Sequence, residues 1–172
     1  MKCSVYIAAS VDGFIARSDG AIDWLGAVER PDEDYGYKAF HASIDTFIVG
    51  RKTYDTALTF PEWPYAGKHC VVMSSKSHAS RHGESFSSVS PAELVERLAR
   101  EGRRHAYVDG GSVIQQFLRV GLITEMTLSL IPVLLGEGVR LFGPTGRDVP
   151  LTLISTRAFE SGLVQLVFGT VR

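Results

Sequence analysis

The chain has 172 residues, of which 45% are hydrophobic, and its formal net charge is -1. This length fits one domain, residues 1–172, with enough chain to bury a substantial core. The balanced charge and the absence of a Lys/Arg cluster argue against nucleic acid or an anionic membrane surface as a partner.

The sequence shows no clear membrane span, signal peptide or metal-binding motif. The longest apolar region, residues 122–135, is interrupted by a Thr-Glu pair and a proline, so it is too short to cross a bilayer. The N-terminal apolar run is brief and leads into Asp12, which indicates a first strand rather than a signal peptide. Cys3 and Cys70 lie far apart and show no metal-ligand spacing. We therefore expect a reduced cytoplasmic protein without a metal site.

The first two-thirds of the chain are predicted to alternate strand and helix. Residues 4–10 are apolar enough for a buried strand, and a long loop with two Asp-Gly turns follows. The further elements expected in order are a helix over 35–43, a strand over 45–50, a short helix over 51–58, a loop around Pro61 and Pro64, and a strand over 69–75.

The next helix has a defined start. Ser90 can cap it, Pro91 suits its first position, and Glu93 completes a capping box. A strand over 105–109 and a helix over 112–119, stopped by Gly121, come next. The last third is read as strands over 122–130, 139–142, 151–160 and 163–171, with a hairpin near 161–162. The pattern predicts an α/β fold with a mostly parallel central sheet, helices on both faces and an antiparallel C-terminal edge.

Several catalytic motifs can be excluded. A Gly-Gly-Ser at 110–112 between strand and helix is similar to a nucleophile elbow, but all five histidines precede Ser112 and no triad His follows it. His82 and Glu84 match H-x-E of zinc deaminases, yet no P-C-x-x-C follows. Neither a Walker A pattern nor G-x-G-x-x-G occurs.

Three strand-to-helix junctions could hold anions instead. They are Gly-Arg-Lys-Thr at 50–53, Ser-Ser-Lys at 74–76 and Gly-Gly-Ser-Val at 110–113. Each alone is explained as well by a tight turn, a helix cap or a solvated face. Together, at the carboxyl ends of strands in one sheet, they favour an extended ligand with several phosphates, such as a dinucleotide. Gly110 and Gly111 are expected to be bare so that a pyrophosphate can approach the backbone.

The motifs resemble those of a known family. In chain order they are SVYIAASVDGFIA, IDWL, IVGRKTY, VVMSS, VDGGSVIQQFL and LSLIPVLLGEGVRLF. Between Val5 and about Phe142 the chain resembles the dihydrofolate reductase superfamily. Within it, the chain is most similar to the reductase domain of bifunctional riboflavin-biosynthesis deaminase-reductases and to its stand-alone bacterial relatives. The resemblance implies a dihydrofolate reductase-like three-layer fold.

The resemblance also implies NADPH as the hydride donor. The residues implied to contact it are Ala8 and Ala9 at the nicotinamide amide, Ile15 beside the ring, Gly50, Arg51, Lys52 and Thr53 at the phosphates, Ser74 and Ser75 at the adenosine ribose, and Gly110, Gly111, Ser112 and Val113 at the pyrophosphate. Arg51 and Lys76 are implied to take the 2′-phosphate, since cations near the ribose favour NADP over NAD.

On the substrate side, the resemblance implies a carboxylate on the first helix, supported by a hydroxyl on a later strand. Asp34 is the nearest match to the carboxylate, with Asp32 and Glu33 as competitors, and Ser129 is the nearest match to the hydroxyl. A catalytic Asp34 should be buried, with a raised pKa. The alternative is that Asp34 only stabilises the helix start. Trp24 and Tyr37 are expected to line the pocket.

Three functions stay open at this point. The first is an NADPH-dependent reductase of a small pterin-like or pyrimidine-like heterocycle, including 5-amino-6-(5-phosphoribosylamino)uracil reductase activity. The second is dihydrofolate reductase proper, against which stands the lack of a clear match for the arginine that binds the glutamate tail of folate. The third is a nucleotide-binding protein that has lost its chemistry. The apolar segment LVQLVF in the last strand is expected to pair two copies as a homodimer.

Overall fold

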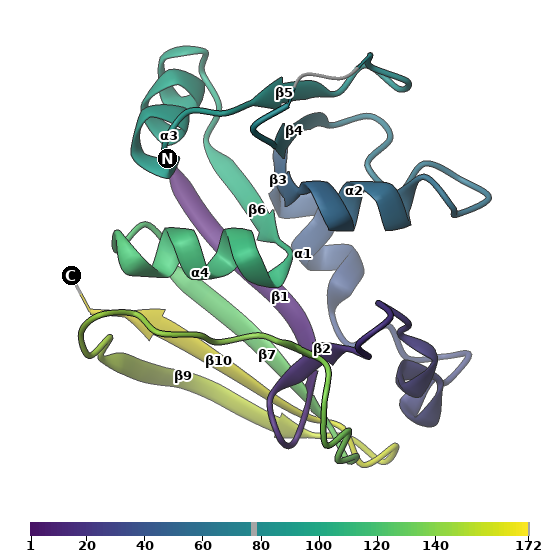
Figure 1. The fold of residues 1–172 in the computed structure, drawn as a ribbon. Coiled ribbons are helices and arrows are strands. Elements are labelled where there is room, and N and C mark those ends of the chain that lie inside the picture. Colours follow the sequence, from purple (N-terminus) through teal and green to yellow (C-terminus); the bar gives the residue numbers. More distant parts are fainter. Residues whose placement is uncertain (77–78, 172) are drawn as a thin grey trace.

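The computed structural model describes residues 1–76 and 79–171 (Figure 1). Its strands are β1 (Lys2–Ser10), β2 (Phe14–Ala16), β3 (Thr46–Gly50), β4 (His69–Met73), β5 (Ser85–Ser87), β6 (His105–Asp109), β7 (Glu125–Ile131), β8 (Val139–Arg140), β9 (Leu151–Ala158) and β10 (Val164–Thr170). Its helices are the 3-10 helix η1 (Asp23–Val28) and the α-helices α1 (Tyr37–Ser43), α2 (Arg51–Ala57), α3 (Pro91–Arg100) and α4 (Gly111–Arg119).

One eight-stranded sheet organises the chain. Its strand order is β5-β4-β3-β6-β1-β7-β10-β9. All neighbours from β5 to β7 are parallel, whereas β10 is antiparallel to both β7 and β9. The predicted mostly parallel sheet with an antiparallel C-terminal edge is confirmed.

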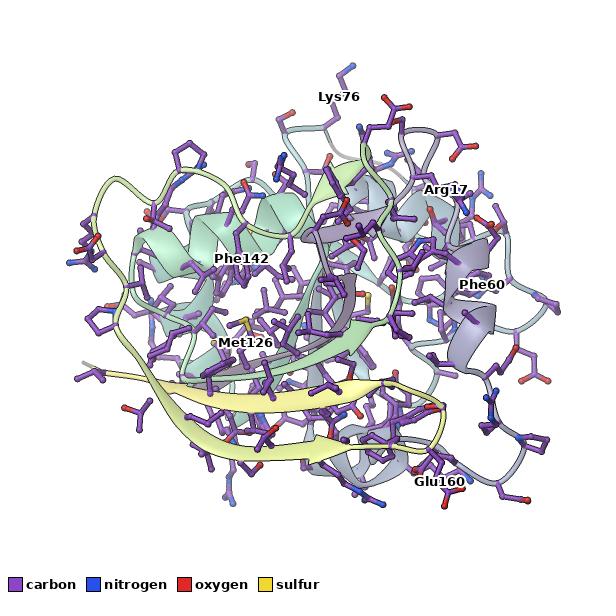
Figure 2. All side chains as sticks on the ribbon, turned by 90° about the horizontal axis from the view of Figure 1, so that it is seen from below. Arg17, Phe60, Lys76, Met126, Phe142 and Glu160 are labelled. Carbon is purple, nitrogen blue, oxygen red and sulfur yellow. The ribbon has the colours of Figure 1, made fainter. Side chains whose placement is uncertain are left out.

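Alternate residues of the central strands enter two separate cores, because successive strand side chains point to opposite faces. Ile48 and Val108 face a cluster that contains side chains of α3 and α4, among them Leu94, Leu98 and Phe117. Their neighbours Phe47 and Tyr107 face a second cluster, to which α2 contributes Tyr54 and α1 contributes Phe40. Figure 2 shows Met126 of β7 in the first core, beneath α4. Helices on both faces of the sheet make the predicted three layers.

The start of α3 follows the sequence prediction. The hydroxyl of Ser90 accepts a hydrogen bond from the backbone N–H of Glu93 at 3.3 Å, and the carboxylate of Glu93 accepts one from the N–H of Ser90 at 3.0 Å. The capping box thus satisfies two backbone donors that the first helical turn leaves without partners.

Short elements differ from the sequence prediction. The segment expected to be one long loop after β1 contains β2 and η1, and β5 was not expected. The strand β2 pairs with β8 more than 120 residues later, with Phe14 opposite Arg140. Such pairings depend on distant chain, so a three-residue strand has little local sequence signal. No helix in the described part of the chain is long and apolar enough to cross a membrane.

Candidate functional site

The carboxyl ends of four adjacent parallel strands form one edge of the sheet. These strands are β4, β3, β6 and β1, in that spatial order. The register aligns their ends, with Gly50 opposite Met73 and Val49 opposite Asp109. The three anion-capable junctions and the end of β1 therefore lie beside one another at the edge where α/β sheets bind ligands.

The first and third junctions are in direct contact. A Cβ on Gly50 would lie 3.1 Å from Cγ2 of Val113, and a Cβ on Gly110 would clash with the hydroxyl of Thr53. Gly111 lies against β2 and β8, because a Cβ there would be 3.1 Å from Cδ1 of Ile15 and 2.9 Å from the carbonyl oxygen of Arg140. Ile15 thus lies next to Gly111.

These contacts correct the expectation for the two glycines. Gly110 has a φ of +92°, a conformation that residues with a Cβ rarely adopt, and Thr53 fills the space that the Cβ would need. At Gly111 the neighbouring backbone fills that space. The chain's own packing requires both glycines, whether or not a phosphate approaches them.

The start of α4 still offers backbone donors. Within the described residues, the N–H groups of Gly111 and Ser112 have no hydrogen-bond acceptor, as is usual for the first turn of a helix. Val113 differs from the expectation, because its side chain is buried in the core and its N–H donates to the carbonyl of Gly110 at 3.0 Å. Two free N–H groups beside an exposed serine hydroxyl fit an anion.

The second junction makes a local turn. The hydroxyl of Ser74 donates to the carbonyl of Lys76 at 2.9 Å and accepts from its N–H at 3.1 Å. Ser75 and Lys76 are exposed, and Figure 2 shows Lys76 extending from the edge of the molecule. Hydroxyl and ammonium groups are therefore available here, although the hydroxyl of Ser74 already has partners.

Asp34 is not the buried acid that the resemblance implies. Its carboxylate is exposed and accepts hydrogen bonds from the N–H groups of Gly36 at 3.0 Å and Lys38 at 3.1 Å. These bonds hold the pKa of Asp34 below its usual value, the opposite of the expected shift. The geometry matches the alternative, a carboxylate that stabilises the start of α1.

Ser129 also has a different partner. Its buried hydroxyl accepts a hydrogen bond from the side-chain amide of Gln165 at 3.1 Å, not one linked to Asp34. The same amide donates to the hydroxyl of Tyr6 at 3.0 Å and the carbonyl of Tyr35 at 3.1 Å. Gln165 is the one amide in the apolar LVQLVF strand, a signal that could have drawn attention to it.

Asp109 is the carboxylate that sequence reasoning missed. It ends β6 immediately before the two glycines and accepts a hydrogen bond from the N–H of Gly110 at 2.8 Å. Burial raises the pKa of Asp109 to about 6, although that hydrogen bond acts in the other direction. Its position at the carboxyl end of a buried strand was the available signal. A carboxyl group with this pKa can hold and release a proton near neutral pH.

Tyrosine side chains lie near this carboxyl group, because, in addition to burial, its charge raises the pKa of Tyr37, Tyr65 and Tyr107. Burial raises the pKa of Tyr37, and the charge of Asp109 raises it further. Tyr37 makes an edge contact with Tyr6 at 5.6 Å between ring centroids. Trp24 is buried near Ala8, and its indole N–H has no hydrogen-bond partner within the part of the chain that the structure describes. A buried donor without a partner is costly, and an acceptor from a ligand would offset that cost.

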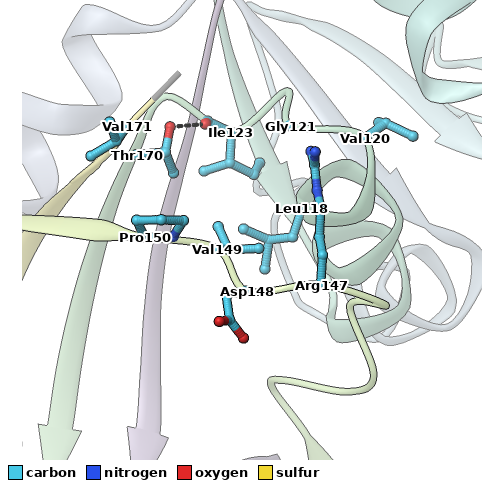
Figure 3. A pocket seen from close by; sticks show the side chains of 10 residues that line it. All are labelled: Leu118, Val120, Gly121, Ile123, Arg147, Asp148, Val149, Pro150, Thr170 and Val171. Atoms are coloured by element: carbon cyan, nitrogen blue, oxygen red, sulfur yellow. Dashed lines mark hydrogen bonds between the residues drawn. The ribbon is translucent and has the colours of Figure 1, made fainter.

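A separate pocket of about 320 Å³ lies at the opposite end of the strands (Figure 3). It is lined by the end of α4, the approach to β7 and the last residues of β10, with Arg147 and Asp148 at its side. Apolar side chains such as Ile123 and Val149 form much of its wall. None of the predicted cofactor residues lines it, so it is not part of the candidate site.

Comparison with known proteins decides the family. The model of the RibD C-terminal domain matches residues 63–165. The uncharacterized protein YwjB of Bacillus subtilis (strain 168) is 35% identical over 162 residues, which cover 92% of each chain. This chain belongs to the RibD C-terminal domain family. A second uncharacterized Bacillus subtilis member, YyaP, is 32% identical and covers 94% of this chain and 91% of its own.

Solved structures agree with membership of the RibD C-terminal domain family. A protein from Shewanella sp. PV-4, provisionally assigned to riboflavin biosynthesis, superposes with a TM-score of 0.94 at 33% identity over 100% of both chains. RibD of Acinetobacter baumannii superposes with a TM-score of 0.71 at 16% identity, covering 99% of this chain and 58% of its own. At that identity the second comparison shows the fold alone.

Proposed function

We propose that this RibD C-terminal domain protein is an NADPH-dependent reductase of a small pyrimidine-like or pterin-like heterocycle. The observation that carries the proposal is the meeting of three anion-capable junctions at the carboxyl ends of adjacent strands. This edge joins free N–H groups at the start of α4 with the cations of Arg51, Lys52 and Lys76. A ligand with several separated phosphates suits such an edge.

The residues present fit the cofactor. Gly111 and Ser112 would hold the pyrophosphate through backbone N–H groups, while Ala8, Ala9 and Ile15 would border the nicotinamide. NADPH supplies a hydride when it is bound, and the protein contributes position and electrostatics.

Asp109 is the proposed proton donor. A reduced heterocycle must take up a proton as well as a hydride, so a protonated acid is needed at the pocket. The pKa of Asp109 is raised to about 6 by burial, whereas that of Asp34 is held low by two N–H groups. Asp109 therefore keeps its proton closer to neutral pH than Asp34 does, and it lies beside the glycine junction.

Titration with NADPH, followed by its fluorescence, tests the cofactor assignment. We expect saturable binding that weakens roughly tenfold or more in an Arg51→Ala variant, since charged hydrogen bonds contribute about 1.5–3 kcal/mol. Arg100→Ala is the matched control, because Arg100 is an exposed arginine on α3 that pairs with Glu96, away from the strand ends. Absence of saturable binding to the wild-type protein would refute the proposal.

Measuring NADPH oxidation with different substrates distinguishes the three candidate functions. With NADPH present, we expect oxidation with aminouracil-type pyrimidines or small pterins and little with dihydrofolate. Efficient turnover of dihydrofolate would favour the second function, and tight NADPH binding with no turnover across the panel would favour the third.

A further inference from the structure

One amide side chain joins three neighbouring strands on the face of the sheet that α1 covers. Gln165 of β10 lies opposite Ser129 of β7, which in turn lies opposite Ala8 of β1. Tyr6 is two residues before Ala8, so it lies on the same face. The amide nitrogen of Gln165 donates to the hydroxyl of Ser129 at 3.1 Å and to that of Tyr6 at 3.0 Å. Gln165 thus connects β10, β7 and β1 by side-chain hydrogen bonds.

The same amide also holds a strained turn before α1. Tyr35 has a φ of +57°, and among residues 1–76 and 79–171 it is the one non-glycine residue with a positive φ. This conformation is costly for a residue with a Cβ, so it persists where neighbouring groups hold it. The carbonyl of Tyr35 accepts hydrogen bonds from the amide of Gln165 at 3.1 Å and from the hydroxyl of Tyr6 at 2.6 Å. Both donors belong to the sheet.

The other contacts of Tyr35 are local or come from the hairpin after β9. Its N–H donates to the carboxylate of Glu33 at 2.8 Å. Its hydroxyl donates to that of Ser161 at 2.9 Å, and its ring makes an edge contact with Phe159 at 4.8 Å between centroids. Gln165 and Tyr6 are therefore the residues that tie the turn to the central part of the sheet.

Tyr6 remains a donor at neutral pH. Burial raises the pKa of its hydroxyl, and the charges of Asp34 and Glu33 raise it further, although the hydrogen bond from Gln165 acts in the other direction. Arg157 lies opposite Gln165 on β9, but its guanidinium pairs with Glu33 at 3.8 Å. The carbonyl of Tyr35 is thus held by two neutral donors.

The turn determines where α1 begins. Tyr35 is followed by Gly36, which has a φ of +90°, and α1 starts at Tyr37. The ring of Tyr37 makes an edge contact with that of Tyr6 at 5.6 Å between centroids. Because Tyr37 is two residues after Tyr35, its position follows that of the carbonyl that Gln165 holds.

The helix α1 lies over the face of β6 that carries Asp109. Phe40 of α1 contacts the ring of Tyr107 at 5.1 Å between centroids. Tyr107 and Asp109 are two residues apart on β6, so their side chains point to the same face. In addition to burial, the charge of Asp109 raises the pKa of Tyr37, so these two groups lie close enough to interact. A shift of the start of α1 would let water reach Asp109.

We propose that Gln165 is a positioning residue for the candidate site: through the carbonyl of Tyr35 it fixes the start of α1, which keeps Tyr37 beside Asp109. The proposal rests on the proposed function, in which Asp109 is the proton donor, and deepens it. The hydrogen bonds of Gln165 go to β7, β1 and the turn, whereas the cofactor junctions follow β3, β4 and β6. Loss of Gln165 should therefore alter the acid and leave cofactor affinity unchanged.

Titration of the Asp109 carboxyl group by carbon-13 NMR tests the proposal. Gln165→Met keeps the length of the side chain but donates no hydrogen bond. We expect the pKa of Asp109 to fall from about 6 toward the ordinary aspartate value of about 4, because water reaches the carboxyl group once the start of α1 loosens. Asp109→Asn identifies the signal.

Ser90→Ala is the matched control for this titration. It removes the cap of α3 and lowers stability without touching the turn before α1, so the pKa of Asp109 should stay at about 6. A purely structural role for Gln165 would lower the stability of Gln165→Met in the same way and leave the pKa of Asp109 unchanged, which would overturn the proposal.

A second variant separates the two donors to the turn. Tyr6→Phe leaves the amide of Gln165 bonded to the carbonyl of Tyr35, so the pKa of Asp109 should fall less than in Gln165→Met. The double variant removes both hydrogen bonds and should give the largest fall. If the pKa of Asp109 is the same in the double variant as in wild type, the turn does not position α1 and the proposal is wrong.

Cofactor binding and turnover give an independent readout. Gln165→Met should bind NADPH within about twofold of wild type, since distant sites act independently. With a diaminouracil as the probe, NADPH oxidation by the variant should decline at lower pH than in wild type, because the acid loses its proton earlier. A decline at the wild-type pH, or a loss of NADPH affinity as large as the loss of turnover, would contradict the positioning role.

The two proposals fail separately. If the wild-type protein does not bind NADPH, the proposed function fails, while the carboxyl titration still shows whether Gln165 sets the surroundings of Asp109. If NADPH binds but the pKa of Asp109 does not change in Gln165→Met or in the double variant, only the inference fails.

Discussion

Asp34 and Asp109 show how surroundings, rather than residue type, set the chemistry of a carboxyl group. Asp34 is exposed and bonded to two N–H groups, so its pKa is lowered. Asp109 is partly buried, and burial raises its pKa to about 6. At neutral pH the first is a fixed anion that stabilises a helix start, whereas the second can exchange a proton.

The raised pKa of Asp109 predicts that Asp109→Asn stabilises the folded protein, and that this gain in stability depends on pH. A pKa raised in the folded state means that the folded protein holds the proton more tightly, so wild-type stability falls as the pH rises from about 4 to above 6. Asparagine carries no charge and can still accept from Gly110. The variant should be more stable by on the order of 2–3 kcal/mol near pH 8 and equal to wild type near pH 4.

Urea unfolding of both proteins at several pH values checks this prediction. Asp34→Asn is the control, and the lowered pKa of Asp34 predicts the opposite sign, a loss of stability near pH 8. A gain for Asp109→Asn that does not change with pH would contradict the raised pKa.

Gly110 is predicted to stabilise the fold. Gly110→Ala should lower the free energy of unfolding by roughly 1–3 kcal/mol, because the backbone has a φ of +92° and the Cβ would clash with Thr53. Thermal unfolding measures the loss. Gly20→Ala is the control, since its φ of +91° carries similar strain but no atom lies within 4 Å of the added Cβ. If both variants lose the same free energy of unfolding, the contact with Thr53 does not contribute to the loss.

At the scale of elements, α3 is the helix whose start the sequence describes most fully. Its first turn satisfies its donors with the side chains of Ser90 and Glu93, so the local sequence alone defines the boundary. In contrast, α1 begins after Gly36, which makes no side-chain cap, and its start depends on Asp34 and on packing against Tyr6. Locally capped ends can be predicted, and ends held by tertiary contacts cannot.

Loss of the cap should destabilise the protein measurably. We expect Ser90→Ala to lower the free energy of unfolding by about 1 kcal/mol, the usual contribution of an N-cap serine. Ser88→Ala, two residues earlier and also exposed, should have no effect. Chemical denaturation of both variants measures the difference, and equal stabilities would show that the capping box does not contribute.

At the scale of the whole molecule, β9 is the least covered part of the sheet. All eight of its residues are exposed, although it is an edge strand with large apolar side chains at Leu151, Leu153 and Ile154. Exposed apolar edge strands promote association with another chain. The LVQLVF segment that was expected to pair two copies belongs to β10, which lies between β7 and β9 and has no free edge. We therefore propose that β9, not β10, is where a second copy would pair.

The oligomeric state tests this expectation. Light scattering after size exclusion should give twice the 18.8 kDa mass of one chain. Ile154→Glu should give a monomer, because a charge would be buried in the interface. Phe60→Glu is the control, an exposed apolar side chain far from β9 (Figure 2). A wild-type monomer would exclude the homodimer.

The sequence by itself determined the element order, the parallel sheet with its antiparallel edge and the three junctions. These follow from local signals: apolar periodicity, a capping box, and glycines or cations at strand ends. The strand β2 escaped prediction because its pairing partner β8 lies more than 120 residues later. The strand β5 has only three residues, too few for a clear alternating pattern.

Only the tertiary structure decided the roles of individual side chains. Burial and hydrogen-bond partners set them, and these depend on which elements pack together. Because of packing, Asp109 and not Asp34 is the carboxyl group with a raised pKa. The hydroxyl of Ser129 accepts a hydrogen bond from Gln165, and Arg81 lines the same pocket as Arg51. It also explained Gly110 and Gly111 by close contacts with Thr53 and Ile15, which no local pattern in the sequence could reveal.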